Sequence, residues 1–297
     1  MPAFVSTTFM RLVLCMLCLL LGGGCSMLRV GYGHVDSVAA WMVHDYFDLN
    51  ADQRDLFAQR FERLHTWHRQ TQLPEYAQFL TDIQSRAKRG LRDSDLLWLV
   101  DGSKQRYARM AARGAADAAD LLATLTPEQI EVFRQQVDKD NRKFMRERRI
   151  ADSEAERRKV VQQRTLSQLR DWVGPLTDTQ EARVIALLQT MPLVDKLRHE
   201  DRLRRQREFF ALLELRSGDR TAFAQRLRDW LEHWEAGRSA EQARLFDESW
   251  KKRAELYAAI DRLLTPVQRN HLVSKLQDYI DDFRELSKAR PGVALSR

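Results

Sequence analysis

The side chains best suited to hold a metal ion lie together in one short stretch of the chain. Glu62, His65 and His68 are spaced by three residues, which places a carboxylate and two imidazoles near one face of a helix. Glu-x-x-His recurs in di-iron bundles, but such a site needs a second copy of the motif on a facing helix. The sequence has no second copy with this spacing. Because His68 also follows the apolar stripe of the predicted helix, we expect core packing here, and we predict no metal and no cofactor.

Motifs that support catalysis are also missing from the sequence. There is no Gly-x-Ser-x-Gly elbow, no phosphate-binding loop and no His-Glu-x-x-His. Gly31-x-Gly33 lacks the third glycine and the preceding strand that would make it a phosphate cradle. We therefore predict a protein that acts by binding and not as an enzyme, and we find no sign of a small-molecule substrate.

Cys25 offers covalent chemistry of a different kind. The apolar run from Leu12 to Leu21 is about half the roughly 20 residues of a membrane-spanning helix, and small residues lead from it to Cys25. This pattern resembles the export signal of bacterial lipoproteins, which implies cleavage before Cys25 and a diacylglyceryl thioether on its sulfur. We expect residues 1–24 to be a signal peptide that starts at either Met1 or Met10. The mature chain would then be lipid-anchored, and without Cys15 and Cys18 it would contain no disulfide.

The elements that carry these residues are predicted to be helices throughout. The 297 residues include only 12 Gly and 7 Pro, and 31% of the residues are charged. Apolar residues recur at spacings of three and four, as in Leu272, Leu276, Tyr279, Phe283 and Leu286. We predict an all-α fold, an elongated multi-helix bundle with a long charged helical arm. Residues 25–35 would form a lipidated linker, 36–289 the helical periplasmic domain and 290–297 a disordered tail.

Four predicted helix starts share one motif, Leu followed by Thr or Asn and then by Gln three residues later. In a capping box the Thr or Asn side chain accepts a hydrogen bond from a first-turn N–H, and the Gln side chain accepts one from the cap residue's N–H. The four pairs are Asn50 with Gln53, Thr126 with Gln129, Thr177 with Gln180, and Thr265 with Gln268. Ser239 and Gln242 form a fifth box without the leucine. Leu-Thr-x-x-Gln also resembles the signature of Spy-like periplasmic chaperones, which implies a role in holding unfolded clients.

The residues just after Cys25 carry a second resemblance. Cys25-Ser26 is followed by Arg29, Tyr32, Trp41 and an aromatic segment that leads into the Leu-x-x-x-Gln helix start. The chain is similar to a family of uncharacterised bacterial lipoproteins, which implies an origin in a bacterium with two membranes. By lipoprotein sorting rules, Ser26 implies transfer to the outer membrane, with the domain facing the periplasm.

Positive charge is concentrated between Arg142 and Arg170. The whole chain has a net charge of +7, and this stretch alone contains ten basic and four acidic residues. We expect one helix from Pro127 to about Asp171, roughly 70 Å long at 1.5 Å per residue, whose middle forms a basic arm. A second charged stretch, from Lys196 to Glu208, could lie beside it. The candidate partner-binding residues are Arg146, Arg148, Arg149, Arg157 and Arg158.

Two interpretations of this basic stretch remain open. Its charges could only solvate a long helix through pairs such as Glu154 with Arg158. Alternatively, the arm contacts envelope proteins or an anionic envelope surface, whereas export argues against nucleic acid. We expect a chaperone-like or envelope-stress role. The alternative is a structural or assembly lipoprotein with one defined partner, and the lesser alternative is a hydrolase or metalloprotein.

Overall fold

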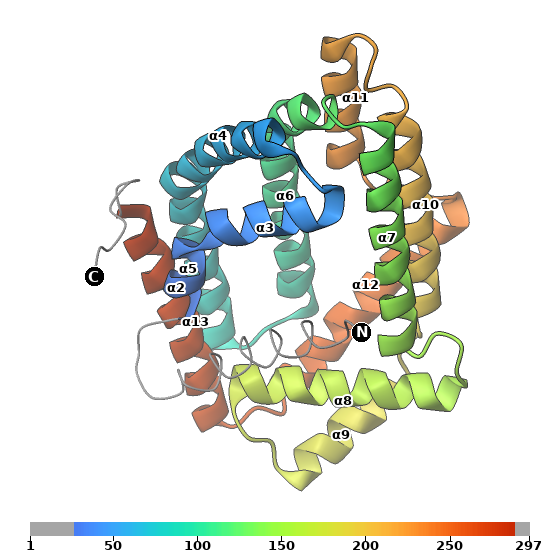
Figure 1. Ribbon diagram of the computed structural model, residues 1–297. Coiled ribbons are helices and arrows are strands. Elements are labelled where there is room, and N and C mark those ends of the chain that lie inside the picture. Colours follow the sequence, from blue (N-terminus) through green and yellow to red (C-terminus); the bar gives the residue numbers. More distant parts are fainter. Residues whose placement is uncertain (1–26, 289–297) are drawn as a thin grey trace, which may run out of the picture.

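The computed structural model describes residues 27–288, and all regular structure in this range is helical (Figure 1). No strand occurs between residues 27 and 288. The all-α, multi-helix class predicted from the sequence is therefore confirmed. The predicted signal peptide, Cys25 and the predicted tail lie outside the described residues.

The first part of the described chain contains six helices, and four of them line the cavity described below. The six are α2 (Met27–Gly33), α3 (Val35–Phe47), α4 (Ala51–Trp67), α5 (Leu73–Arg89), α6 (Asp93–Leu122) and α7 (Pro127–Glu147). A π-helical turn, η1 (His68–Gln72), joins α4 to α5. Pro74 lies at the start of α5 and has no N–H for a regular helical bond, which accounts for the wider turn before it.

The second part of the chain adds six helices to the description. They are α8 (Glu154–Val173), α9 (Asp178–Gln189), α10 (Asp195–Leu213), α11 (Arg220–Glu232), α12 (Ala240–Asp261) and α13 (Pro266–Lys288). Within the predicted linker over residues 25–35, residues 27–33 are helical, and Arg29 Nε lies 2.5 Å from the buried carboxylate of Asp282 on α13. An ion pair to a buried carboxylate holds this segment on the domain.

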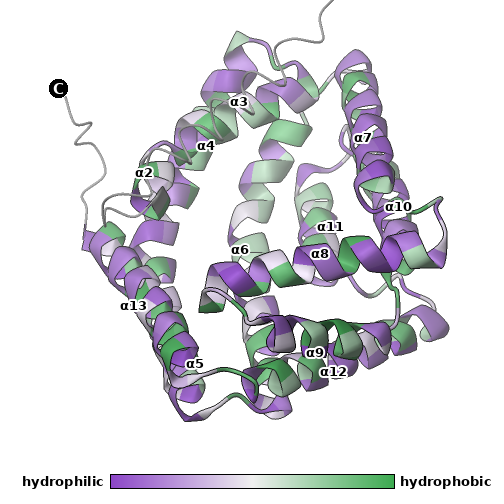
Figure 2. Ribbon diagram, turned by 90° about the horizontal axis from the view of Figure 1, so that it is seen from below, coloured by the Kyte–Doolittle hydropathy of each residue, from purple (hydrophilic) through white to green (hydrophobic). Residues whose placement is uncertain are grey.

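The helices are arranged as a broad frame and not as one elongated bundle. Figures 1 and 2 show α5 beside α13 on one side and α7 beside α10 on the opposite side, and in Figure 1 α8 and α9 lie below. Two apolar cores lie within this frame. One contains the buried residues Leu49, Leu122, Leu213 and Phe223, and the other is formed by α8, α9 and α12 around Val184 and Ile260.

The predicted single helix from Pro127 to Asp171 is wrong, because the chain turns between α7 and α8. Arg149 has a left-handed backbone with φ of 52°, and the side chain of Ile150 is buried. Ser153 then caps α8 by accepting a hydrogen bond from the N–H of Glu156 at 3.3 Å. Ser153-x-x-Glu156 is a capping-box sequence, so a local signal for this break was present. The expectation that residues 196–208 lie beside this region is confirmed, because Asn141 on α7 is hydrogen bonded to Gln206 on α10 at 2.8 Å.

All the predicted capping boxes form. The side chains of Asn50, Thr126, Thr177 and Thr265 each accept from the Gln N–H three residues later, and each Gln side chain accepts from the cap residue's N–H. Ser239 and Gln242 form the fifth box. The local physics of the motif is therefore as the sequence predicts.

The four leucine-preceded boxes are also joined in pairs, which the sequence did not predict. Gln53 and Gln129 exchange side-chain hydrogen bonds of 2.9 and 2.6 Å, and each donates a second bond across the junction, to the carbonyl oxygens of Thr124 and Asp48. We call this arrangement the first glutamine clasp. It joins the loop between α3 and α4 to the loop between α6 and α7.

Gln180 and Gln268 form a second glutamine clasp with the same register. Their side chains exchange bonds of 2.8 and 2.9 Å, and they donate to the carbonyl oxygens of Leu263 and Pro175. In both clasps the accepting carbonyl lies two residues before the partner's cap residue. The two clasps therefore repeat one structural solution, at the α8–α9 and α12–α13 loops.

Candidate binding cavity

A cavity of about 790 Å³ that could hold a ligand lies between α3, α4, α6, α7, α10 and α11. Its volume lies within the range of small-molecule sites, roughly 300 to 1,000 Å³. The first glutamine clasp fixes the loops from which α4 and α7 start. The same motifs that cap these helices therefore hold four of the six cavity walls in place.

Aromatic rings from four helices form a continuous wall of this cavity. Phe47 on α3 stacks on Phe133 on α7 with ring centroids 4.5 Å apart, and Phe133 meets Phe209 on α10 edge to face at 5.7 Å. Phe209 in turn lies 5.1 Å from the ring of Trp230 on α11. Rings bury a large apolar surface in a fixed geometry, so this wall suits an apolar ligand. We call these four residues the aromatic wall.

Three arginines of α10 line the cavity beside the aromatic wall. Arg198, Arg202 and Arg205 are spaced by four and three residues and therefore share one helical face. We call them the arginine stripe. Burial, and next to it the charge of Arg253, lowers the pKa of the Arg198 guanidinium below its ordinary value. Positive charge is thus held in partly desolvated surroundings at this wall.

The carboxylates that line the cavity are already bound by other residues. Asp117 accepts from Arg63 at 2.5 Å, and Asp140 accepts a short hydrogen bond from the Tyr46 hydroxyl. Burial, together with Asp140, raises the pKa of Tyr46 to about 12, so Tyr46 remains a donor at neutral pH. Each of these two carboxylates therefore already accepts a hydrogen bond from the chain itself.

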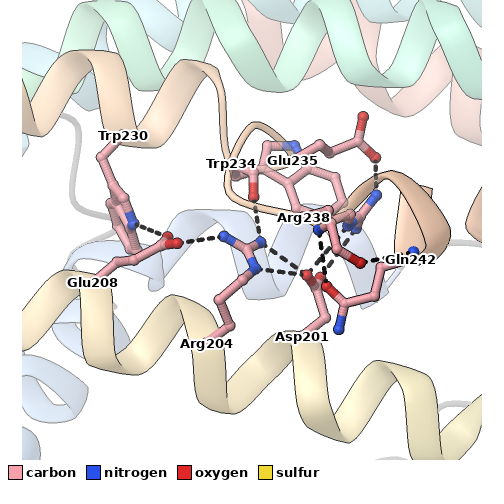
Figure 3. A network of polar contacts seen from close by, with 9 residues as sticks. Asp201, Arg204, Glu208, Trp230, Trp234, Glu235, Arg238 and Gln242 are labelled. Carbon is pink, nitrogen blue, oxygen red and sulfur yellow. Dashed lines mark hydrogen bonds and ion pairs between the residues drawn. The ribbon is translucent and has the colours of Figure 1, made fainter.

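The third lining carboxylate, Asp201, is the centre of a buried network (Figure 3). Arg204 and Arg238 donate to it at 2.8 and 3.0 Å. Burial opposes the ionisation of Asp201, but these hydrogen bonds lower its pKa below the ordinary value. Arg204 also donates to Glu208 at 2.6 Å, and Glu208 accepts from the indole N–H of Trp230 at 3.2 Å.

This network sets the orientation of α10. Asp201, Arg204 and Glu208 lie on one face of α10. Their hydrogen bonds join this face to α11 and to the loop before α12. The arginine stripe lies on the neighbouring face and is thereby directed to the cavity. Gly237 makes this close approach possible, because a Cβ there would lie 2.2 Å from a carboxylate oxygen of Glu208.

The arginines predicted to contact a partner do not form one exposed surface. Arg148 pairs with Asp195 at 3.4 Å, and Arg149 pairs with Asp152 and Glu156 across the turn between α7 and α8. Arg158 binds Glu154 and two backbone carbonyls at the end of α9 and just after it. Arg146 is exposed, and Arg157 has a buried Nε without a hydrogen-bond partner. Contact with a partner through this set remains a prediction.

The structure places His65 and His68 in an aromatic cluster with Tyr32. Tyr32 lies 4.7 Å from the His65 ring, and its hydroxyl is 2.8 Å from His68 Nδ1, whereas Glu62 is exposed. Burial lowers the pKa of His68 to about 4 and raises that of Tyr32 to about 12. Within residues 27–288 no group of three His, Cys, Asp or Glu side chains could hold a metal ion.

Sequence reasoning missed the arginine stripe, although a signal for it existed. The stretch from Lys196 to Glu208 was interpreted only by its charge. Its three arginines at i, i+4 and i+7, followed by Phe209, form an amphipathic pattern with a cationic face. The aromatic wall carried no comparable signal, because its rings come from segments far apart in the sequence.

The fold and the cavity define a class of protein, an all-α domain whose described part contains an aromatic, arginine-lined cavity. A family model matches residues 45–242, and the chain belongs to that family, the family of unknown function DUF6279. The matched range contains nearly the whole cavity lining and the network of Figure 3. Neither a curated protein nor a solved structure matches the chain. No helix within the described residues is both long and apolar enough to cross a membrane.

Proposed function

We propose that this chain is a lipid-anchored binding protein of the bacterial cell envelope and that the aromatic cavity is its binding site. The export signal and Cys25 support the anchor, and Ser26 supports the outer membrane. The observation that carries the binding role is the 790 Å³ cavity with its wall of stacked rings. Such a surface gains free energy by taking apolar groups out of water.

Binding without catalysis is supported by the polar groups at the cavity. The lining carboxylates Asp117, Asp140 and Asp201 are each held by donors of the chain itself. A general base or nucleophile needs a group that can exchange protons with a substrate, whereas each of these carboxylates already accepts a hydrogen bond from the chain. Holding an apolar group, as chaperone-like proteins do, needs no such group.

The experiment is site-specific photocrosslinking in cells with the full chain. A photoreactive residue at Phe144 lies in the cavity, whereas one at the adjacent Met145 is exposed on the outer side of α7 and serves as the matched control. We expect adducts at position 144 and none at 145. Adducts only at position 145, or at neither position, would contradict the proposal.

The trapped material also separates the candidate roles. Many unrelated envelope proteins would indicate a chaperone, and low-mass material would indicate a carrier of small apolar ligands. One polypeptide at fixed stoichiometry would favour the second candidate, an assembly or structural lipoprotein with a defined partner. That candidate is favoured by the exposed side chains of Trp41 and Met42 on α3, which offer an apolar contact surface outside the cavity.

A further inference from the structure

We propose that the cavity binds an anionic amphiphile, an acyl chain with a carboxylate or phosphate head, and that the arginine stripe binds the head. This inference rests on the proposed function, because it names the chemistry of the occupant of the same cavity. Three observations carry it: the stripe has no ion-pair partner among residues 27–288, the nearby carboxylates accept hydrogen bonds from other residues, and the remaining wall is aromatic.

None of the three arginines forms an ion pair with a carboxylate of the described residues. Arg202 donates from Nε to the amide oxygen of Asn141 at 2.8 Å, and its terminal nitrogens form no hydrogen bond with residues 27–288. Arg205 lies 5.3 and 5.0 Å from the ring centroids of Trp230 and Trp234, and its buried Nε has no hydrogen-bond partner. Arg198 is attracted by Asp195, but Arg148 already pairs with that carboxylate.

Partly buried cations without anions lose part of their hydration uncompensated, so three of them on one cavity wall favour a bound anion. The neighbouring network explains why the chain does not supply one itself. Asp201 and Glu208 lie on the same helix as the arginine stripe but on its adjacent face. There Arg204 donates to both carboxylates, and Arg238 also donates to Asp201. A guanidinium presents a planar pair of donors that matches a carboxylate or phosphate group, and Arg205 is already oriented by its two indole neighbours.

The aromatic wall determines what is attached to the anion. From Arg205 the wall runs through Trp230, Phe209 and Phe133, and it offers rings and not hydrogen-bonding groups. A bound polypeptide segment would bring backbone N–H and C=O groups that need partners on burial. An acyl chain brings none. The combination of a cationic face and an apolar wall therefore favours an amphiphile over a peptide.

The test uses membranes that contain the full chain and a photoactivatable analogue of palmitate with a diazirine in its acyl chain. After irradiation, adducts are mapped to peptides, which separates labelling of the cavity from any acylation at Cys25. We expect labelling within α10 and α11. The variant Arg198→Gln/Arg202→Gln/Arg205→Gln should lose at least tenfold of it, whereas Arg207→Gln, an exposed arginine of the same helix, should retain it.

A competition experiment on the unaltered chain keeps the test independent of folding. Laurate and dodecanol have the same chain length but differ in charge. We expect laurate to displace the probe at a concentration at least tenfold lower than dodecanol does. Lysophosphatidylglycerol as a third competitor distinguishes a phospholipid from a free fatty acid as the source of the head. Whichever anionic competitor acts at the lower concentration identifies the closer head group.

The results separate this inference from the proposed function. Equal displacement by laurate and dodecanol, or full labelling of the triple variant, would overturn head-group recognition while leaving the cavity as a binding site. Polypeptide adducts at position 144 without acyl labelling would overturn the amphiphile and keep a binding role. The absence of both kinds of adduct would overturn both proposals.

Discussion

At the scale of single residues, the four clasp glutamines show why their side chains must be amides. In Gln129 the side-chain oxygen accepts from Thr126 N–H and from Gln53, and the nitrogen donates to Gln53 and to the carbonyl oxygen of Asp48. All four hydrogen-bonding positions of a buried amide are thus satisfied. A carboxylate would accept the same bonds as a capping residue but could donate none.

The first prediction concerns Gln129→Glu. We expect this change to lower the free energy of unfolding by about 3 kcal/mol, because a buried charge would face the carbonyl oxygen of Asp48. The matched control is Gln242→Glu, in an exposed box whose glutamine only accepts from Ser239 N–H, and it should change stability by less than about 0.5 kcal/mol. Urea denaturation measures both. Equal effects of the two changes would show that the clasp adds nothing to the cap.

The second prediction concerns His68 and pH. Burial holds its folded pKa at about 4, below the unfolded value of about 6.5, so the unfolded chain binds the proton first. Stability is therefore complete above pH 6.5 and decreases as the pH falls from about 6.5 to about 4. The loss should be roughly 1 to 2 kcal/mol, since the ring is only partly buried. In His68→Gln this contribution should disappear from the difference between unfolding curves at pH 7 and pH 4. Parallel pH profiles of variant and parent would contradict the assignment.

At the scale of helices, close packing depends on positions where no side chain fits. α5 and α6 approach each other where Phe79 covers Gly102, and a Cβ on Gly102 would lie 2.6 Å from the Phe79 ring. That ring cannot move easily, because Trp98 lies 4.9 Å from it and the Arg106 guanidinium 3.7 Å. A single methyl group added at Gly102 would therefore overpack the contact between α5 and α6.

The third prediction compares two glycines of α6. Gly102→Ala should destabilise the protein by about 1 to 3 kcal/mol through overpacking. Gly114→Ala should stabilise it by roughly 0.5 to 1 kcal/mol, because its Cβ would make an ordinary contact 3.5 Å from Leu64 and alanine is the better helix former. Thermal unfolding of the two variants checks the opposite signs. A stabilised Gly102→Ala would mean that Phe79 can move aside.

At the scale of the whole molecule, the family range and the structural unit do not coincide. The match ends at residue 242, yet Gln180 within it is clasped to Gln268 on α13, and α13 packs along α5. The residues after 242 therefore complete the fold around the first part of the chain. The predicted lipid anchor at Cys25 would decide where this unit operates, and this prediction can be tested directly.

The fourth prediction concerns Cys25. In cells fed a clickable fatty acid, the full chain should be labelled and should migrate as the shortened mature form. Cys25→Ala should lose the label and remain at precursor length, whereas Cys15→Ala and Cys18→Ala should behave as the parent does. Labelled Cys25→Ala would contradict the assigned lipidation site.

Much of the helical architecture could be predicted from the sequence because its signals are local. Each capping box lies within four residues, so Asn50 with Gln53 identifies the start of α4 as reliably as the structure does. The signal for the break before α8 is equally local, because Ser153 and Glu156 form a capping-box sequence. An unbroken helix was expected there because charged residues continue through the break. Charge alone gives no helix boundary, since a solvated helix and a turn can share one composition.

The sequence by itself determined the all-α class and the capped helix starts, because periodicity and caps act within one or two turns. Only the tertiary structure decided that Gln53 meets Gln129 across 76 residues and that Gln180 meets Gln268 across 88. It also decided that the arginine stripe faces an aromatic cavity, because the network around Asp201 sets the orientation of α10. Pairing between distant segments depends on how the helices pack, and no local pattern encodes which capped loop or which aromatic ring will be the neighbour.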